Sequence, residues 1–239
     1  MVGAWRLKTY EVLPSTSDLC STLAEAGEPS GLAVLAREQT RGRGSRGRDW
    51  TAPPGNLNLS VLIRPREPMA SIAQWSLLAA VALSEALSPI AELRVKWPND
   101  LLLDGRKVAG ILLDSADDGQ GGVAWLVIGM GVNLSQTPDP HDPGVASLGT
   151  TEPPEKVAAR VLERLDVWSR VRTLEGFAPV RAAWLSRAQE IGAFVSLRVG
   201  QDRLGGQFAG LGEDGSLLLR TGGRVHAFTT GEVMLGGRG

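Results

Sequence analysis

Apolar and polar positions in the first part of the chain predict strands separated by helices. Apolar or alternating runs predict three strands, at residues 5–12, 31–36 and 57–63. The last run alternates between apolar and polar residues, which predicts a half-buried strand. The first helix carries its apolar residues through Leu19 and Leu23 and stops at Gly27, with Ser15 and Thr16 as candidate N-caps. Residues 70–87 are alanine-rich and predict a long amphipathic helix.

A β-hairpin with an interrupted first strand is predicted over residues 93–115. Pro98 breaks that strand, and Asp104 with Gly105 forms a two-residue hairpin signal. The hairpin sets Lys107 close to the corner at residues 97–100. Two interpretations of this lysine stay open: it lies at a solvated sheet edge, or it meets an anionic ligand, because a charged group on a buried strand needs a partner.

The last part of the chain changes character. Residues 123–129 predict a buried strand, and helices are predicted from a cap at Thr151 to about residue 174 and over residues 179–189. Short strands follow, and glycine-containing pairs at 205–206, 214–215 and 222–223 are the expected turns. We therefore expect an α+β fold, with a mixed β-sheet and packed helices over residues 1–191 and a small β-barrel over residues 192–239.

Arginine and glycine are concentrated in residues 39–50, QTRGRGSRGRDW. Glycine lets the backbone turn sharply and approach a ligand, and arginine offers a charged fork of donors that matches phosphate or carboxylate. This composition fits a mobile loop that closes over an anionic small molecule. It also fits a solvated segment that touches RNA nonspecifically.

Overall composition restricts the choice. The net charge of −1 argues against a general nucleic-acid binder, and 43% apolar residues are ordinary for a globular protein. Cys20 is the single cysteine, and its apolar helical setting favours a buried structural thiol over a nucleophile. His141 and His226 lack motif context and are expected at the surface. We expect no membrane span and no signal peptide, and hence a cytoplasmic protein.

Five motifs together resemble the biotin protein ligases, in the family's order. They are Ser15-Thr16, the Arg/Gly loop at residues 39–50, KWPND at 96–100, RKVAGIL at 106–112 and IGMGVN at 128–133. The type that it resembles is the monofunctional one, since the family's N-terminal helix-turn-helix has no room before Ser15. The resemblance implies no sequence-specific DNA binding, a class II synthetase-like sheet and an SH3-like C-terminal barrel.

The resemblance also implies an activity. Biotin and ATP, with Mg²⁺ accompanying the nucleotide, would give biotinyl-5′-AMP, and a lysine of a biotin carboxyl carrier protein would then accept the biotinyl group. The enzyme would act as a monomer or homodimer. A lipoate or octanoate ligase or transferase of the same fold is the nearest alternative, although those families lack the GRGxRGR loop.

Roles for individual residues follow from the motifs they match. The resemblance assigns catalytic roles to Lys107, Arg43 and Asp100. Biotin binding falls on Ser15, Thr16, Ser17, Gln39, Gly42, Arg43, Trp50, Lys107, Gly110, Leu112 and Gly129. ATP and adenylate binding fall on Arg43, Gly44, Ser45, Arg46, Arg48, Asn99, Lys107 and Asn133. No metal-binding residue is identified, and Mg²⁺ is expected to accompany ATP.

Two positions depart from the family pattern. Ser45 stands where the family usually has an arginine that retains the adenylate, so we expect slow capture or leakage of the intermediate. Ser17 replaces an asparagine that follows Ser15-Thr16 in the family, which changes one hydrogen bond expected on the biotin side.

Overall fold

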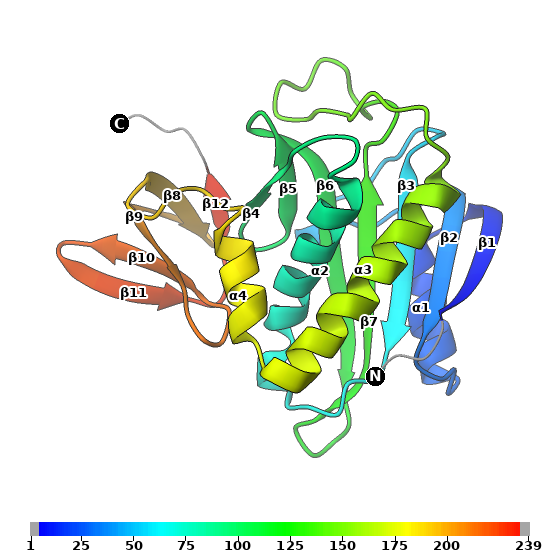
Figure 1. Ribbon diagram of the computed structural model, residues 1–239, viewed down its shortest axis with the longest axis horizontal. Helices are drawn as coiled ribbons and strands as arrows, with labels where there is room; N and C mark the ends of the chain where they lie inside the picture. Colours follow the sequence, from blue (N-terminus) through cyan, green and yellow to red (C-terminus); the bar gives the residue numbers. More distant parts are fainter. Residues whose placement is uncertain (1–4, 235–239) are drawn as a thin grey trace.

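A seven-stranded sheet forms the body of the computed structural model, which describes residues 5–234 (Figure 1). The strand order is β1-β2-β3-β7-β6-β5-β4, and the sheet is mixed because β1 and β2 run parallel and the other pairs antiparallel. Its strands are β1 (Arg6–Leu13), β2 (Leu32–Gln39), β3 (Leu57–Ile63), β4 (Arg94–Lys96), β5 (Asp100–Leu103), β6 (Arg106–Asp117) and β7 (Val123–Val132). The mixed sheet with packed helices is as predicted.

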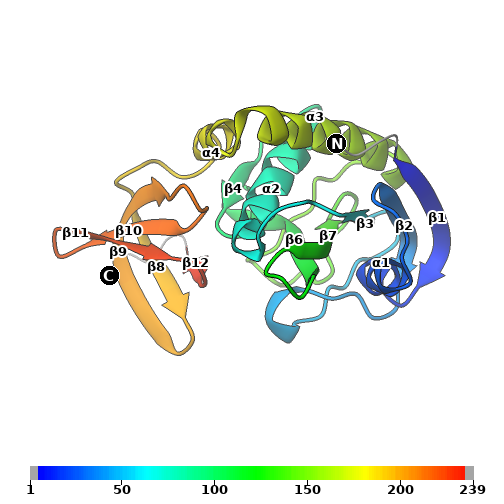
Figure 2. The ribbon, with the colours of Figure 1, turned by 90° about the horizontal axis from the view of Figure 1, so that it is seen from below.

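Helices cover both faces of this sheet (Figure 2). They are α1 (Thr16–Glu25), α2 (Ala73–Leu87), α3 (Pro154–Glu175) and α4 (Ala178–Leu185), with short 3₁₀ turns at Ser45–Gly47 and Met69–Ser71. Alternation in β2 separates the faces: Ala33 and Leu35 belong to the main core under α2 and α3, whereas Leu32 and Val34 pack with Cys20 of α1. Polar residues on the α1 face are therefore held apart from the main core.

Helix coverage on both faces corrects two predictions. Strand β3 was expected to be half-buried, but all seven of its residues are buried. Helix α2 was expected to be amphipathic, but 12 of its 15 residues are buried. The segment Met69–Leu87 is long and apolar enough to cross a membrane by length and composition alone, but 67% of its 18-residue apolar window is buried inside the protein. Here it is the central core helix.

The C-terminal strands form a second sheet of order β11-β10-β9-β8-β12, antiparallel throughout. Its strands are β8 (Phe194–Val199), β9 (Asp202–Leu211), β10 (Leu217–Thr221), β11 (Arg224–Phe228) and β12 (Glu232–Met234). Among the residues described, no pairing joins β11 to β12, so a closed barrel is not confirmed. The predicted turn at Gly205-Gly206 is wrong, because both residues lie inside β9. The turns at 214–215 and 222–223 are confirmed.

The second sheet is tied to the first by side-chain contacts and a continuous apolar core. The indole of Trp97 donates to the Gly215 carbonyl at 3.1 Å, and Arg181 Nε of α4 donates to the Leu211 carbonyl at 2.6 Å. Val195 and Phe208 belong to the same buried cluster as α2 and α3. The two sheets therefore pack as one body.

Predictions for single residues at helix ends, for the cysteine and for the two histidines are confirmed in all cases but one. Ser15 caps α1, its Oγ accepting from Asp18 N at 3.2 Å, as predicted. Thr151 does not cap α3, whose N-cap position is Pro153 without a side-chain bond. Cys20 is fully buried, and burial raises its thiol pKa to about 12. His141 and His226 are exposed, as expected.

Candidate active site

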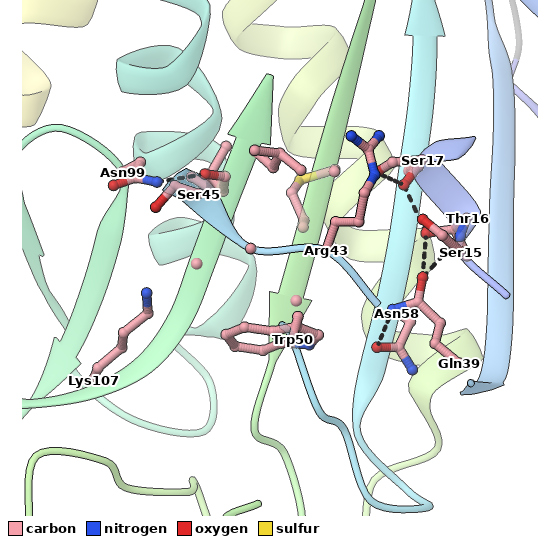
Figure 3. Close-up of a pocket in the computed structure, with 18 residues that line it drawn as sticks. Ser15, Thr16, Ser17, Gln39, Arg43, Ser45, Trp50, Asn58, Asn99 and Lys107 are labelled. Carbon is pink, nitrogen blue, oxygen red and sulfur yellow. Dashed lines mark hydrogen bonds between the residues drawn. The ribbon is translucent and has the colours of Figure 1, made fainter. Parts of the chain in front are cut away.

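A cavity opens on the α1 face of the large sheet, where the Arg/Gly loop crosses strands β3, β7 and β6 (Figure 3). Its empty space, counted with the open mouth, is about 460 Å³. It is lined by Ser15, Thr16, Ser17, Gln39, Arg43, Gly44, Ser45, Trp50, Asn58, Ser60, Asn99, Lys107, Gly110, Ile111, Leu112, Gly129, Met130 and Gly131.

One end of the cavity is a connected hydrogen-bond network. The Thr16 hydroxyl lies 2.7 Å from Ser60 Oγ and 3.1 Å from Gln39 Oε1, while Thr16 N donates to the same Gln39 oxygen at 2.8 Å. Ser17 Oγ lies 3.0 Å from Ser60 Oγ, and Gln39 Nε2 donates to Asn58 Oδ1 at 3.2 Å. Because the network is buried and internally satisfied, its side chains are held in fixed positions.

Glycines in β6 and β7 make the floor of the cavity. A Cβ at Gly129 would lie 2.5 Å from Ser17 Oγ, and one at Gly131 would overlap the Trp50 indole. A Cβ at Gly110 would lie 3.2 Å from Lys107 Nζ. Trp50 thus rests on bare backbone, and its Nε1 is buried without a hydrogen-bond partner.

Lys107 approaches the cavity from the other end. Asp104 and Gly105 have φ of 50° and 79°, which gives the tight hairpin turn that was predicted. The register of β5 against β6 shifts beyond this turn, because Leu102 faces Lys107 but Leu101 faces Ala109. This bulge re-aims Lys107, whose Nζ lies 5.8 Å from the centre of the Trp50 ring.

The ammonium of Lys107 is held by Asp100. Lys107 Nζ lies 2.6 Å from Asp100 Oδ1, and Lys96 Nζ lies 3.0 Å from Asp100 Oδ2. The carboxylate is buried, and both of its oxygens are engaged by lysines. The corner at residues 97–100 lies against Lys107, as the hairpin predicted, and Asn99 Nδ2 fixes it to β6 by donating to the Ile111 carbonyl at 2.7 Å.

The Arg/Gly loop folds back on itself as a narrow hairpin. Gly44 N donates to the Arg48 carbonyl at 2.7 Å, and Trp50 N donates to the Gly42 carbonyl at 2.9 Å. Arg43 is clamped between two carboxylates, with its Nε 2.7 Å from Asp18 Oδ1 and its Nη atoms on Asp114.

Two other arginines of the loop do not line this cavity. Arg46 and Arg48 both reach Glu232 on β12 of the second sheet. Burial tends to raise the pKa of Glu232, but the hydrogen bond from Arg198 and the charges of Arg48 and Arg46 outweigh it and lower this pKa.

Most of the residues predicted as a site gather at this cavity, but five do not line it: Gly42, Arg46, Arg48, Asp100 and Asn133. Gly42 supports the loop backbone, and Asn133 is buried, donating its Nδ2 to the Ala146 carbonyl at 3.0 Å. Asn133 Oδ1 has no partner.

Five lining residues were not assigned to the site from the sequence: Asn58, Ser60, Ile111, Met130 and Gly131. Asn58 and Ser60 had a usable signal. They are polar residues at alternate positions of an apolar strand, so they share one face of it.

The arrangement joins three chemical environments. It places hydrogen-bonding groups at one end, an apolar slot over glycines in the middle and cations at the other end. Within residues 5–234, no group of three or more His, Cys, Asp or Glu side chains is placed to hold a metal ion. The geometry suits a ligand with a polar head, an apolar body and an anionic tail.

Comparisons with known proteins identify one family. Residues 9–133 match the model of the Biotin/lipoate A/B protein ligase family. The chain is 39% identical over 238 residues to a biotin–[acetyl-CoA-carboxylase] ligase of Paracoccus denitrificans, covering 91% of this chain and 98% of that protein. A Mycobacterium tuberculosis ligase of the same name is 32% identical, with 92% and 85% covered. Among solved structures, a biotin protein ligase from Aquifex aeolicus in complex with biotin and ATP superposes with a TM-score of 0.82 at 28% identity, covering 96% of this chain and 97% of that one.

Proposed function

The chain belongs to the biotin/lipoate A/B protein ligase family, and from this we propose that its cavity carries out the biotin ligase reaction. The chain activates biotin with ATP and transfers the biotinyl group to a protein lysine. The observation that carries the proposal is the pairing of a buried amide-and-hydroxyl network with Lys107 across one glycine-floored cavity. A cyclic urea, an aliphatic tail and a carboxylate match these three parts in order.

The reaction has two steps. A carboxylate oxygen of biotin attacks the α-phosphorus of ATP, and the bond to the β,γ-phosphates breaks to release pyrophosphate. The neutral amine of an acceptor lysine then attacks the carbonyl carbon of biotinyl-5′-AMP. AMP leaves with the electron pair of the broken C–O bond, and the nitrogen releases one proton to solvent as the amide forms. Both steps build negative charge on oxygen, so fixed cations stabilise their transition states.

The polar network is the biotin head-group end. Thr16, Gln39 and Ser60 offer hydrogen-bonding atoms that are already oriented by one another, and Ser17 completes the wall beside Gly129. An analogue that lacks the matching donors and acceptors leaves these buried groups unpaired, which disfavours its binding. Trp50 and Leu112 provide apolar surface for the tail.

Lys107 is the cation for the biotin carboxylate and the developing phosphoryl charge. Its ammonium lies 2.6 Å from a carboxylate oxygen of Asp100, a contact of the kind that we propose for the biotin carboxylate. We assign Asp100 a positioning role, because Lys96 and Lys107 occupy both of its oxygens. Removing a charged contact of this kind costs about 2–4 kcal/mol of transition-state stabilisation.

The Arg/Gly loop covers the adenylate. Arg43, Gly44 and Ser45 line the cavity now, and Asn99 and Asn133 are placed by their motifs on the nucleotide side. An ordered loop excludes water that would hydrolyse the mixed anhydride. Mg²⁺ would come with ATP, held mainly by phosphate oxygens.

Finer features complete the proposal. The acceptor is a biotin carboxyl carrier domain, in keeping with the names of the relatives. We divide the chain into a catalytic part, residues 1–191, and an SH3-like unit, residues 192–239, whose outer ends lie outside the described residues 5–234. We place the enzyme in the cytoplasm, as a monomer or homodimer without sequence-specific DNA binding.

Biotin-dependent ATP–pyrophosphate exchange tests the proposal. We expect exchange in the wild type, a loss of about a hundredfold or more in Lys107→Ala, and wild-type exchange in Lys8→Ala, a matched control on the exposed edge strand β1. Exchange with lipoate or octanoate but not biotin would move the enzyme to the other branch of the family. Failure of all three acids would refute the adenylation reading.

A further inference from the structure

Glu232 gathers three arginines from two distant parts of the chain. Its Oε2 lies 2.6 Å from Arg46 Nη1 and 2.5 Å from Arg198 Nη2, and its Oε1 lies 3.5 Å from Arg48 Nη1. The carboxylate side chain is only 17% exposed, less than any of the arginines that reach it. A partly buried carboxylate with several charge-assisted bonds is held more firmly than one in an exposed pair.

The second sheet fixes where this carboxylate stands. Glu232 of β12 is directly paired with Arg198 of β8, so both side chains leave the same face of the sheet. That face is turned toward the Arg/Gly loop, which supplies Arg46 from 186 positions away in the sequence. The site-forming loop is therefore docked on an element outside the large sheet.

The docked conformation has a local cost that the contact offsets. Arg46 has φ of 61° and ψ of 35°, a left-handed backbone that is unfavourable for a residue with a Cβ. Arg46 also makes one of the short contacts to Glu232, at 2.6 Å. The same residue thus carries both the strained backbone and the docking contact.

A second cavity, with about 590 Å³ of empty space counted with its open mouth, lies between the loop and the 229–232 segment. Arg46 and Arg48 line it together with Thr229 and Thr230, and it shares Ser45 and Asn99 with the cavity of the active site. The two arginines therefore stand at the mouth of the site. Three arginines and one glutamate leave this cluster with a formal charge of 3 − 1 = +2, so Glu232 holds the cations in place without neutralising them.

We propose that Glu232 is a positioning residue for adenylation: its carboxylate docks the Arg/Gly loop on the second sheet and sets Arg46 and Arg48 beside the mouth cavity, where the β- and γ-phosphates of ATP lie. This inference rests on the proposed function. Glu232 touches neither biotin nor the reacting phosphorus, and it acts through the arginines. The hydrogen-bond network that we propose for the biotin head group lies at the opposite end of the site and makes no contact with Glu232.

The test compares Glu232→Gln and Glu232→Asp with the wild type. We expect Glu232→Gln to raise the KM for ATP in pyrophosphate exchange by about tenfold, the value of one charge-assisted contact. It should speed release of biotinyl-5′-AMP and leave the Kd for biotin alone unchanged. The shorter Glu232→Asp keeps the charge and should fall between the two. Glu213→Gln, which changes an exposed carboxylate in the turn between β9 and β10, is the matched control.

Loop docking has a readout that does not depend on catalysis. Without substrates, limited trypsin digestion should cleave at residues 41–48 at least about five times faster in Glu232→Gln than in wild type, because an undocked loop opens more often. Equal loop cleavage and equal KM for ATP in the two proteins would overturn the proposal. An absence of biotin-dependent exchange in the wild type would instead sink the proposed function, while loop cleavage would still report on docking.

One further variant separates positioning from sheet stability. Arg198→Gln removes a Glu232 partner without touching the loop. We expect this variant to leave loop cleavage and the KM for ATP close to wild type, because Glu232 still holds Arg46 and Arg48. If Arg198→Gln reproduces the effects of Glu232→Gln, the carboxylate serves the second sheet alone and the proposal is wrong.

Discussion

A methyl group at Gly129 should couple to the hydroxyl of Ser17. The Cβ of Gly129→Ala would lie 2.5 Å from Ser17 Oγ, inside the 3.0 Å that Cβ atoms essentially never enter. Relief requires Ser17 to move, which breaks its 3.0 Å contact with Ser60 Oγ. A lost neutral hydrogen bond costs about 1 kcal/mol and overpacking about 1–3 kcal/mol. We expect a destabilisation of about 1–3 kcal/mol.

Removing the hydroxyl first should abolish this cost. In a Ser17→Ala background the next atom met by the new Cβ is Ser60 Oγ at 3.5 Å, which is an ordinary contact. Gly129→Ala should then cost less than about 0.5 kcal/mol, giving a coupling energy of about 1–2 kcal/mol between the two sites. The assay is a double-mutant cycle by urea unfolding, with thermal unfolding as a check at about 2–4 °C per kcal/mol.

The same cycle reads out on the ligand. If the network binds the biotin head group, Gly129→Ala should weaken biotin about 5–30-fold by calorimetry, a loss of about 1–2 kcal/mol. The KM for ATP should change little. Changes in the free energy of unfolding that simply add in the double variant would refute the steric reasoning. Unchanged biotin affinity in folded Gly129→Ala would show that the biotin head group does not bind at this end of the cavity.

Three further outcomes follow from the site and its surroundings. Ser45→Arg should slow release of biotinyl-5′-AMP by about tenfold, because it adds a charge-assisted contact at a position that lines the cavity; equal release rates in quench-flow or filter assays would contradict this. Cys20, with a pKa near 12, should react with Ellman's reagent about a thousandfold more slowly in the native protein than when unfolded in urea, so rapid native labelling would be the contrary result. Glu152 has its pKa lowered to about 2, chiefly by the hydrogen bond from Arg160. Its contribution to stability should therefore be complete above its ordinary pKa of 4.5 and be lost as the pH falls toward 2, and the stability gap between wild type and Glu152→Gln should close over that range.

Sequence patterns predicted those features whose cause is local. The positive φ angles of Asp104 and Gly105 follow from a two-residue turn, and the cap at Ser15 follows from a hydroxyl before an apolar stripe. The same reasoning failed where distant elements decide. Strand β3 alternates between apolar and polar residues, but its polar residues line a cavity under α1, not solvent.

Long-range charge pairing was also hidden from the sequence. The arginines at 43, 46 and 48 look equivalent in an Arg/Gly run, yet Arg43 contacts Asp18 and Asp114 whereas the other two contact Glu232. Nothing local to the loop distinguishes them, because their partners come from α1, β6 and β12. The strand that carries Glu232 was itself missed, since only three residues make it up.

The hydrogen-bond network of Thr16, Ser17, Gln39, Asn58 and Ser60 has a thermodynamic consequence. Its side chains hold one another in single rotamers. Their conformational entropy is therefore lost when the chain folds and not when a ligand binds. Such preorganisation favours enthalpically driven binding with little change in protein mobility at that end. The Arg/Gly loop differs, because its arginines at 43, 46 and 48 are 41–54% exposed and their ion pairs are open to solvent. One cavity thus joins a rigid, hydrogen-bonded end to a more adaptable loop.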